Sequence, residues 1–283
     1  MKVAIQGIEG SFHDQACREL LGNKASLVEC STFSEVFKTV DGELASHGLI
    51  AIENSLVGTI LSNYRLLRTS DMQVTGEVNI PIAHQLMALP GTTIEQITEV
   101  RSHPMALRQC REFFEQHPWI RLIEDMDTAS CAKTLAHEQV AHRAVVASER
   151  AAELYGLEII ATNIQTHPEN YTRFLLLEPQ DEAVPSSESN KASISFHVSH
   201  TVGTLAEVLQ FIASCRMNLT KIQSMPLERK PWEYYFHLDM EYKRAEDFQN
   251  MLYFLKSKVS DLKVLGTYEK YVPSSATLHI ETT

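Results

Sequence analysis

Short apolar runs alternate with amphipathic helical stretches through about residue 178. This alternation is typical of a parallel or mixed α/β sheet. In the stretch after Ser102, a good N-cap residue, Leu107, Cys110, Phe113 and Phe114 share one face at a spacing of about 3.6 residues. The predicted strands of this region include residues 3–6, 49–53, 83–89, 99–102, 144–147 and 174–177.

A second region follows a segment with the composition of an exposed linker. Residues 178–189 (EPQDEAVPSSES) combine prolines, acidic residues and serines. Beyond them Ile194, Phe196 and Val198 alternate with polar residues, which predicts a half-buried strand. Thr204 and Glu207 have the spacing of a helix capping box. The next predicted elements are strands 219–227 and 233–242, joined by a turn at 229–231, a helix at 245–258 and a strand at 262–268. The order βαββαβ is ferredoxin-like.

The charge balance narrows the classes of partner. The formal net charge is -11, from 25 basic and 36 acidic residues, whereas phosphate neutralisation needs clustered basic residues. The segment MKVAIQGIEG lacks a basic region followed by a long apolar one, and no apolar stretch approaches the roughly 18 residues of a membrane span. We therefore expect a cytoplasmic protein that binds neither nucleic acid nor membrane.

The cysteines and histidines do not form a metal-binding pattern. The five cysteines are widely spaced without a CxxC pair, which predicts neither disulfides nor a zinc site. His197 and His200 lie on a predicted strand with odd spacing, so their side chains should point to opposite faces. We expect no metal.

Polar and small residues follow several predicted strands, where open α/β sheets bind ligands. They are Gly7, Gly10, Ser11, Glu53, Asn54, Ser55, Ser102, His103 and Thr128. Each also has a structural interpretation, since the glycines suit a tight turn, Ser102 and Thr128 suit helix N-caps, and Glu53 suits a solvated surface. Their accumulation at successive strand ends nevertheless indicates a binding site.

Five strings resemble the motif series of prephenate dehydratases, in that family's order. They are AIENSLVGTI (51–60), SHPMALRQC (102–110), DTASCA (127–132), ASERAAELYGL (147–157) and NYTRF (170–174). The strings VGTLAEVL, NLTKIQSMP and WEYYFHLDME resemble the ACT domain of the same family. The resemblance covers nearly the whole chain, and the ordered set is far more specific than any one string.

The resemblance implies a two-lobed catalytic domain like a periplasmic binding protein, at residues 1–180. One lobe would comprise roughly 1–78 with 162–180 and the other 79–161, with crossings near 74–80 and 159–165 and the site in a cleft between the lobes. A linker at 181–191 would lead to an α+β ACT domain at 192–283. A closing cleft suits a small dianion that must be shielded from water.

The implied reaction is the decarboxylating dehydration of prephenate to phenylpyruvate, and it needs no cofactor. The resemblance assigns Thr172 to the leaving hydroxyl as hydrogen-bond donor or proton shuttle, and Arg173 to a carboxylate. Because successive strand residues point to opposite sides, these two side chains need not both face the cleft. Glu53 is either a general acid with a raised pKa or a structural element.

Hydroxyl and amide groups of the motifs are expected to bind substrate oxygens, with helix N-termini at Ser11, Ser102 and Thr128 adding backbone donors. The capping and binding interpretations compete for the same atoms. The expected substrate-binding set is Asn54, Ser55, Ser11, Ser102, His103, Thr128, Ala129, Asn170 and Phe174. Three positions depart from the family pattern without removing a catalytic atom, namely Ala51 for proline, His13 for serine and Gln85 for cysteine.

The ACT resemblance implies feedback inhibition by L-phenylalanine in a homodimer or homotetramer. The expected effector-binding residues are Gly203, Thr204, Leu205, Ala206, Asn218 and Leu219. The family's usual Glu-Ser-Arg-Pro string is here Gln223, Ser224, Met225 and Pro226, which puts the inhibition in question.

Two alternatives stay open at this point. The motifs do not distinguish prephenate from arogenate, which carries an amino group in place of the keto oxygen. A non-catalytic sensor using the same cleft belongs to a different class, because a fold alone does not fix a function.

Overall fold

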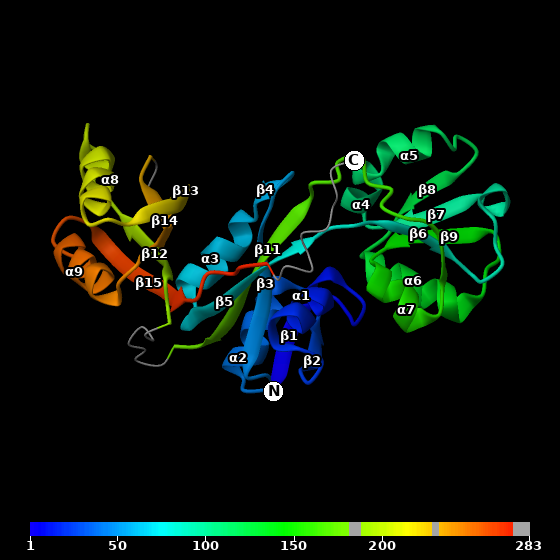
Figure 1. Ribbon diagram of the computed structural model, residues 1–283, viewed down its shortest axis with the longest axis horizontal. Helices are drawn as coiled ribbons and strands as arrows, with labels where there is room; N and C mark the ends of the chain where they lie inside the picture. Colours follow the sequence, from blue (N-terminus) through cyan, green and yellow to red (C-terminus); the bar gives the residue numbers. More distant parts are fainter. Residues whose placement is uncertain (181–187, 228–231, 274–283) are drawn as a thin grey trace. The chain divides into compact units, whose positions relative to one another are not determined.

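The computed structural model describes residues 1–180, 188–227 and 232–273. These residues form two compact units, one of Met1–Thr59 with Val78–Phe174 and one of Ile60–Glu77 with the described residues from Leu175 onward. Strands β5 (Met72–Pro81) and β11 (Tyr171–Pro179) contribute residues to both. Figure 1 labels most of the elements that are described below, unit by unit.

The first unit begins with a parallel arrangement around β1 (Lys2–Gln6). This strand pairs in parallel with β2 (Ser26–Cys30) and with β3 (His47–Asn54), which continues into the short antiparallel β4 (Gly58–Thr59). The helices α1 (Phe12–Leu21) and α2 (Phe33–Asp41) contact these strands. Because β1 and β3 are buried on both faces, they read as continuous apolar runs, as strands of a parallel sheet do.

A second sheet of the first unit has the strand order β10-β6-β9-β7-β8. Its strands are β6 (Gln85–Ala88), β7 (Glu99–Ser102), β8 (Arg121–Glu124), β9 (Arg143–Ala147) and β10 (Glu158–Ala161). Its helices are η1 (Ile94–Gln96), α4 (Pro104–Gln109), α5 (Arg111–Glu115), α6 (Thr128–Glu138) and α7 (Glu149–Tyr155). Leu107, Cys110 and Phe114 are buried in its core, as their shared helix face predicts.

The second unit contains the predicted βαββαβ order, in the sheet order β13-β14-β12-β15. Its elements are β12 (Lys191–His197), α8 (Thr204–Ser214), β13 (Asn218–Pro226), β14 (Tyr234–Glu241), α9 (Ala245–Leu255) and β15 (Ser260–Tyr268). Ile194 and Phe196 pack with both helices in one apolar core. Helix α3 (Leu61–Thr69) belongs to this unit as well.

The alternating polar residues of β12 are buried too, which the prediction of a half-buried strand did not include. Lys191, Ser193 and Ser195 are at most 7 % exposed. Lys191 Nζ lies 2.8 Å from both carboxylate oxygens of Glu77 on β5. Arg68 on α3 donates to Ser195 and lies over the ring of Tyr235, 3.6 Å from its centre.

Further buried polar groups lie on the neighbouring strands. Ser193 Oγ donates to Asp239 Oδ1 at 2.6 Å and lies 2.8 Å from the Tyr268 hydroxyl. The His237 ring packs against Tyr64, with 5.0 Å between the ring centres. Neither ring nitrogen of His237 has a hydrogen-bond partner among the described residues. We call the hydrogen-bonded residues the sheet-face cluster; they are Arg68, Glu77, Lys191, Ser193, Ser195, Asp239 and Tyr268.

The predicted strands are confirmed, with differences of a few residues at their ends. Three helix caps were wrong. Ser102 is the last residue of β7 and His103 caps α4; Asp127, not Thr128, caps α6 by accepting from Ser130 N at 2.7 Å. Gly203, with φ +90°, precedes α8, so Thr204 and Glu207 form no capping box.

Only some of the predicted boundaries between lobes, linker and C-terminal domain fall on described residues. The chain crosses from β5 to β6 at 82–84 and from β10 to β11 at 162–170, so the first crossing lies just beyond the expected 74–80. Residues 60–77, which we expected in the first lobe, cluster with the C-terminal region. Most of the predicted linker and the turn at 229–231 lie outside the described residues. Among the described helices, none is long and apolar enough to cross a membrane.

Candidate functional site

The string Glu53-Asn54-Ser55 lies beside the string Asn170-Tyr171-Thr172-Arg173, because the end of β3 contacts the start of β11. The backbone N–H of Ser55 donates to the Tyr171 carbonyl at 2.8 Å. The Ser55 hydroxyl accepts from Tyr171 N at 3.0 Å and donates to the Glu169 carbonyl at 3.4 Å. We call the residues Glu53, Asn54, Ser55, Asn170, Thr172 and Arg173 the strand-end cluster. Hydrogen bonds thus join two segments, 53–55 and 169–173, that are far apart in sequence.

Asn54 forms hydrogen bonds through both its side-chain oxygen and its side-chain nitrogen. Its Oδ1 accepts from the backbone nitrogens of Leu56 at 3.0 Å and Val57 at 2.9 Å. Its Nδ2 lies 2.7 Å from Asn170 Oδ1, 3.0 Å from Thr172 Oγ1 and 3.1 Å from the Tyr171 carbonyl. The side-chain amide therefore joins the turn after β3 to the start of β11.

Thr172 and Arg173 face opposite sides, as successive residues of a strand do. Thr172 contacts Asn54, whereas Arg173 Nη1 donates to Glu53 Oε1 at 3.2 Å. Both β11 residues are only 8 % exposed. The contact between Glu53 and Arg173 agrees with the structural interpretation of Glu53 that the sequence left open. The contact between Thr172 and Asn54 was not predicted.

The loop before α1 packs against α7 and is hydrogen-bonded to it. Gly10 has φ +90°, and a Cβ there would lie 3.3 Å from both Ala151 Cα and a ring carbon of Tyr155. Ser148 Oγ donates to the Gly10 carbonyl at 2.6 Å, and the Tyr155 hydroxyl donates to the Glu9 carbonyl at 2.7 Å. The positive φ favours glycine here, and a side chain would also require its neighbours to shift by a few tenths of an ångström.

Ser11 caps α1, since its hydroxyl accepts from Asp14 N at 3.3 Å. The predicted helix N-terminus at Ser11 is confirmed. Two neighbouring residues that the sequence did not identify support it: Asp14 Oδ2 accepts from Gly10 N at 2.9 Å, and Arg18 forms an ion pair with Asp14 at 2.7 Å. The only sequence signal for them was the acid–base spacing of four residues.

The second sheet presents a separate group of predicted residues at the carboxyl ends of β7 and β8. His103 Nδ1 accepts from Met105 N at 3.2 Å, and Thr128 is the first residue of α6. Ser102 is fully buried and donates to the Val146 carbonyl at 2.6 Å. Its hydroxyl is therefore already engaged within the sheet.

Two expected substrate-binding residues lie in the core. Ala129 is fully buried on α6, and Phe174 is 1 % exposed. The Phe174 ring packs edge-on against the ring of His13, with 4.9 Å between their centres. Burial lowers the pKa of His13 to about 3, so this residue, one of the departures from the family pattern, is a neutral ring in the core at neutral pH.

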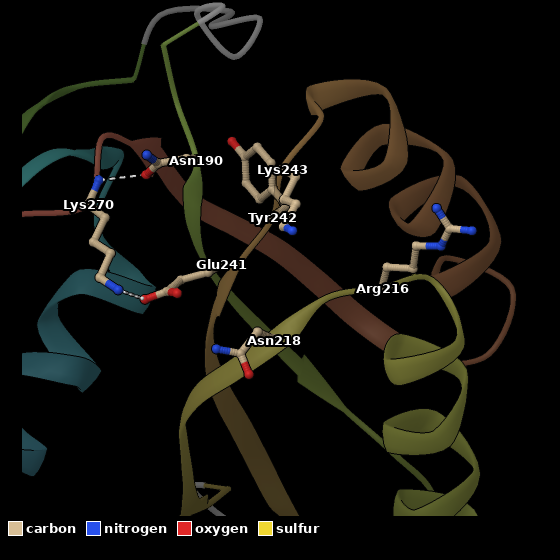
Figure 2. Close-up of a pocket in the computed structure, with 7 residues that line it drawn as sticks. All are labelled: Asn190, Arg216, Asn218, Glu241, Tyr242, Lys243 and Lys270. Carbon is tan, nitrogen blue, oxygen red and sulfur yellow. Dashed lines mark hydrogen bonds and ion pairs between the residues drawn. The ribbon is translucent and has the colours of Figure 1, made fainter.

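The expected effector residues fall at opposite ends of α8. Gly203 precedes the helix, Thr204, Leu205 and Ala206 form its first turn, and Asn218 and Leu219 begin β13 after its end. Leu205 lines one hollow with Trp232 and Phe236. Figure 2 shows the other hollow, of about 340 Å³, where Asn218 lies near Glu241 and Lys270.

The lining of this second hollow is strongly polar. Lys270 Nζ forms an ion pair with Glu241 at 2.7 Å, and Lys270 N donates to Asn190 Oδ1 at 2.7 Å. The hydrogen bond from Lys270 lowers the pKa of Glu241, so this carboxylate is ionised at neutral pH. Arg216 and Lys243 also line the hollow.

Comparison with known proteins decides the family. The family model described as prephenate dehydratase matches residues 3–182. The chain belongs to the prephenate dehydratase family. It is therefore an enzyme, and the resemblance read from the five motif strings is confirmed. Membership in the prephenate dehydratase family favours catalysis over the non-catalytic sensor.

Curated relatives extend over almost the whole chain. A bifunctional chorismate mutase/prephenate dehydratase of Aquifex aeolicus is 37% identical over 95% of this chain and 74% of its own length. The chloroplastic arogenate dehydratase/prephenate dehydratase 2 of Arabidopsis thaliana is 36% identical over 95% of this chain and 72% of its own length. Both substrates named in the sequence analysis thus occur among the names of relatives.

Solved structures share the fold. GqqA, named a novel type of quorum quenching acylase, superposes with a TM-score of 0.86 at 27% identity, covering 96% of this chain and 98% of its own. Prephenate dehydratase of Staphylococcus aureus superposes with 0.81 at 26%, covering 95% and 100%. The enzyme of Arthrobacter aurescens in complex with L-Phe superposes with 0.85 at 24%, covering 98% and 94%.

Proposed function

We propose that the chain converts prephenate to phenylpyruvate, carbon dioxide and water in phenylalanine synthesis. The observation that carries this proposal is the Thr172 hydroxyl, held by Asn54 within a motif set that matches the family. The ring carboxylate leaves as carbon dioxide and leaves its electron pair in the ring. The carbon–oxygen bond to the ring hydroxyl then breaks, and a proton joins the departing oxygen to give water.

We assign Thr172 to the departing oxygen. Its hydroxyl donates a hydrogen bond while the carbon–oxygen bond lengthens, and the proton that completes the water comes ultimately from solvent. A positioned donor of this kind contributes on the order of 10² to 10⁴-fold in rate. The formation of an aromatic ring supplies the driving force, so a weakly acidic hydroxyl suffices.

Arg173 and Glu53 act differently from Thr172 in this proposal, because they lie on the other side of β11. Their ion pair at 3.2 Å stabilises the strand that carries Thr172. Arg173 keeps the expected role at a substrate carboxylate only if the substrate reaches that side. Ser11, His103, Thr128 and the backbone of Ala129 remain the proposed contacts for the anionic groups of the substrate, since helix N-termini bind anions.

The choice between prephenate and arogenate is tested by purifying the full chain and measuring phenylpyruvate from prephenate and phenylalanine from arogenate. We expect kcat/KM for prephenate to be the larger. A preference for arogenate would move the chain to the second activity, for which the Arabidopsis relative is also named. Turnover of neither substrate would contradict the proposed function.

We propose further that the C-terminal βαββαβ region is an ACT-type regulatory domain that binds L-phenylalanine. The complex of the Arthrobacter aurescens enzyme with L-Phe supports this proposal. An 11-residue helix is about 16 Å long, so Gly203 and Asn218 at its two ends cannot both contact one amino acid within one chain. A twofold homodimer would bring one end of α8 to the other end of its copy.

The departure at Gln223 and Met225 bears on this regulation. Met225 is only 4 % exposed, and Gln223 Nε2 donates to the Ser224 carbonyl at 2.8 Å. A buried arginine at position 225 would need a partner, and the methionine removes that need. We therefore propose that inhibition by phenylalanine persists through the Asn218 hollow. The five free cysteines support a reducing compartment such as the cytoplasm.

A further inference from the structure

The orientation of the Asn54 amide is fixed by the protein itself. Its Oδ1 accepts from two backbone N–H groups, those of Leu56 and Val57, and a backbone nitrogen can only donate. The Nδ2 group must therefore point toward Asn170 and Thr172. Because an amide nitrogen has no acceptor capacity, the direction of both contacts is also fixed.

Thr172 and Asn170 each receive a hydrogen bond from this nitrogen. Thr172 Oγ1 accepts at 3.0 Å, so the hydrogen of its own hydroxyl is left for another partner. Asn170 Oδ1 accepts at 2.7 Å, so its Nδ2 points elsewhere. Asn170 is fully buried, and within the described residues its Nδ2 has no hydrogen-bond partner.

An unpaired buried donor is unfavourable, and a ligand oxygen that accepts from it recovers that cost. Asn54, in contrast, has no capacity left for a ligand. Its two amide hydrogens face three acceptors, and both lone pairs of its oxygen face backbone donors. The expected direct contact between Asn54 and the substrate does not fit this geometry.

We propose that Asn54 is a positioning residue that turns two side chains into donors: the Thr172 hydroxyl toward the leaving oxygen and Asn170 Nδ2 toward a second oxygen of the substrate. This inference rests on the proposed dehydratase activity. Asn54 should affect kcat, because it sets the direction in which the Thr172 hydroxyl donates. Asn170 should affect KM, because its Nδ2 contacts the bound substrate.

The decisive variant is Asn54→Asp. The introduced carboxylate keeps an oxygen for the Leu56 and Val57 nitrogens, so the turn after β3 is preserved. Its second oxygen replaces the donor by an acceptor, which makes the Thr172 hydroxyl donate to it instead of to the substrate. At about pH 7.5 we expect kcat to fall about 100-fold or more, with at least about fivefold recovery toward pH 5.5 as the introduced carboxyl becomes protonated and donates again.

Two variants separate the reversed hydrogen bond from the simple loss of a donor and from the added negative charge. Asn54→Ala removes the donor without reversing it, so we expect a smaller loss of kcat, about tenfold, that does not recover on acidification. Leu56→Asp adds the same charge on a side chain that is 44 % exposed, and should lower kcat by no more than about threefold, because an exposed charge is well screened. Circular dichroism and urea unfolding report whether each variant is folded.

Asn170→Asp tests the proposed contact between Asn170 Nδ2 and the substrate without changing the turn after β3. It keeps an oxygen for Asn54 but removes the spare donor, so KM should rise about tenfold or more while kcat stays within about threefold.

The inference is overturned if Asn54→Asp and Asn54→Ala lose kcat equally with flat pH profiles, or if Asn170→Asp leaves KM unchanged. A wild-type chain that converts neither prephenate nor arogenate overturns the proposed function and this inference with it, whereas an active wild type with those variant results overturns the inference alone.

Discussion

The strand-end cluster of the first unit and the sheet-face cluster of the second are both groups of polar residues that are buried or partly buried, apart from the exposed Ser55. Both join strands through side-chain hydrogen bonds and an ion pair. In the sheet-face cluster Lys191 lies between both oxygens of Glu77, and Ser193 lies between Asp239 and Tyr268. In the strand-end cluster the Asn170 amide keeps a donor without a partner in the described part of the chain.

This contrast suggests a way to distinguish polar clusters that bind substrate from polar clusters that stabilise the fold. A cluster whose donors and acceptors are matched contributes to stability and has little left for a ligand. A cluster with spare donors stores an unfavourable energy that a substrate oxygen can relieve. Substitutions in the first kind should therefore change the free energy of unfolding, and substitutions in the second kind should change turnover.

The largest expected effect is that of Thr172→Val. Valine has nearly the shape of threonine but no hydroxyl, so kcat should fall by about 10²- to 10⁴-fold. Thr172→Ser keeps the hydroxyl and should stay within about tenfold of wild type. Steady-state kinetics with prephenate measures both. An active Thr172→Val variant would remove this hydroxyl from the chemistry.

Next comes Lys191→Met, which removes the ammonium group that contacts both oxygens of the buried Glu77 carboxylate. We expect the free energy of unfolding in urea to fall by about 3 kcal/mol or more, because a buried charge that loses its partner is strongly destabilising. The double variant Lys191→Met/Glu77→Gln should recover part of this loss. Unchanged stability of the single variant would show that the pair contributes nothing net.

His237 predicts a dependence of stability on pH. Burial, with a further contribution from Arg68, lowers the pKa of His237 from 6.5 to about 4, so the unfolded chain binds a proton there more readily than the folded chain. The free energy of unfolding should therefore be largest above about pH 6.5 and fall as the pH drops toward 4, by about 1–3 kcal/mol from this group.

His237→Phe is the matched variant, because it keeps an aromatic ring against Tyr64 and cannot titrate. Its unfolding free energy should depend less on pH than that of wild type, with His13 accounting for part of the remaining slope. Equal slopes for the two proteins, measured by urea unfolding at several pH values, would speak against a neutral buried His237.

The smallest predicted effect concerns regulation. Asn218→Ala should raise the phenylalanine concentration for half-maximal inhibition about tenfold, since one ligand hydrogen bond to a charged group is lost. Thr220→Ala, at an exposed position of the same strand outside the hollow, is the control and should change it less than about twofold. Equal shifts in the two variants would argue against the Asn218 hollow as the effector site.

Much of the fold was predictable because hydrophobic periodicity is local. The apolar runs of β1, β3 and β9 and the alternation in β12 and β14 are visible in the sequence, and the structure has strands there. The buried polar face of β12 was not predictable, because it is covered by Arg68 and Glu77, more than 100 residues away in sequence.

The candidate site shows the same limit. Motif order identified Asn54 and Thr172, but only the structure shows that the first donates to the second. The caps at Ser102 and Thr128 were wrong because His103 and Asp127 could cap the same helices one residue away, and a capping pattern alone does not choose between neighbours. Gly10 was read as a turn residue, which its φ of +90° supports, but its close approach to Ala151 of α7 was not visible in the sequence.

The most direct test of the difference between the clusters is to measure kcat with prephenate and the free energy of unfolding on the same preparations of Thr172→Val and Lys191→Met. We predict a crossed result, in which Thr172→Val loses turnover but unfolds within about 1 kcal/mol of wild type, while folded Lys191→Met keeps kcat within about threefold but loses stability. If one variant loses both, or if Thr172→Val loses stability and Lys191→Met loses turnover, spare hydrogen-bonding capacity does not distinguish the catalytic cluster from the structural one.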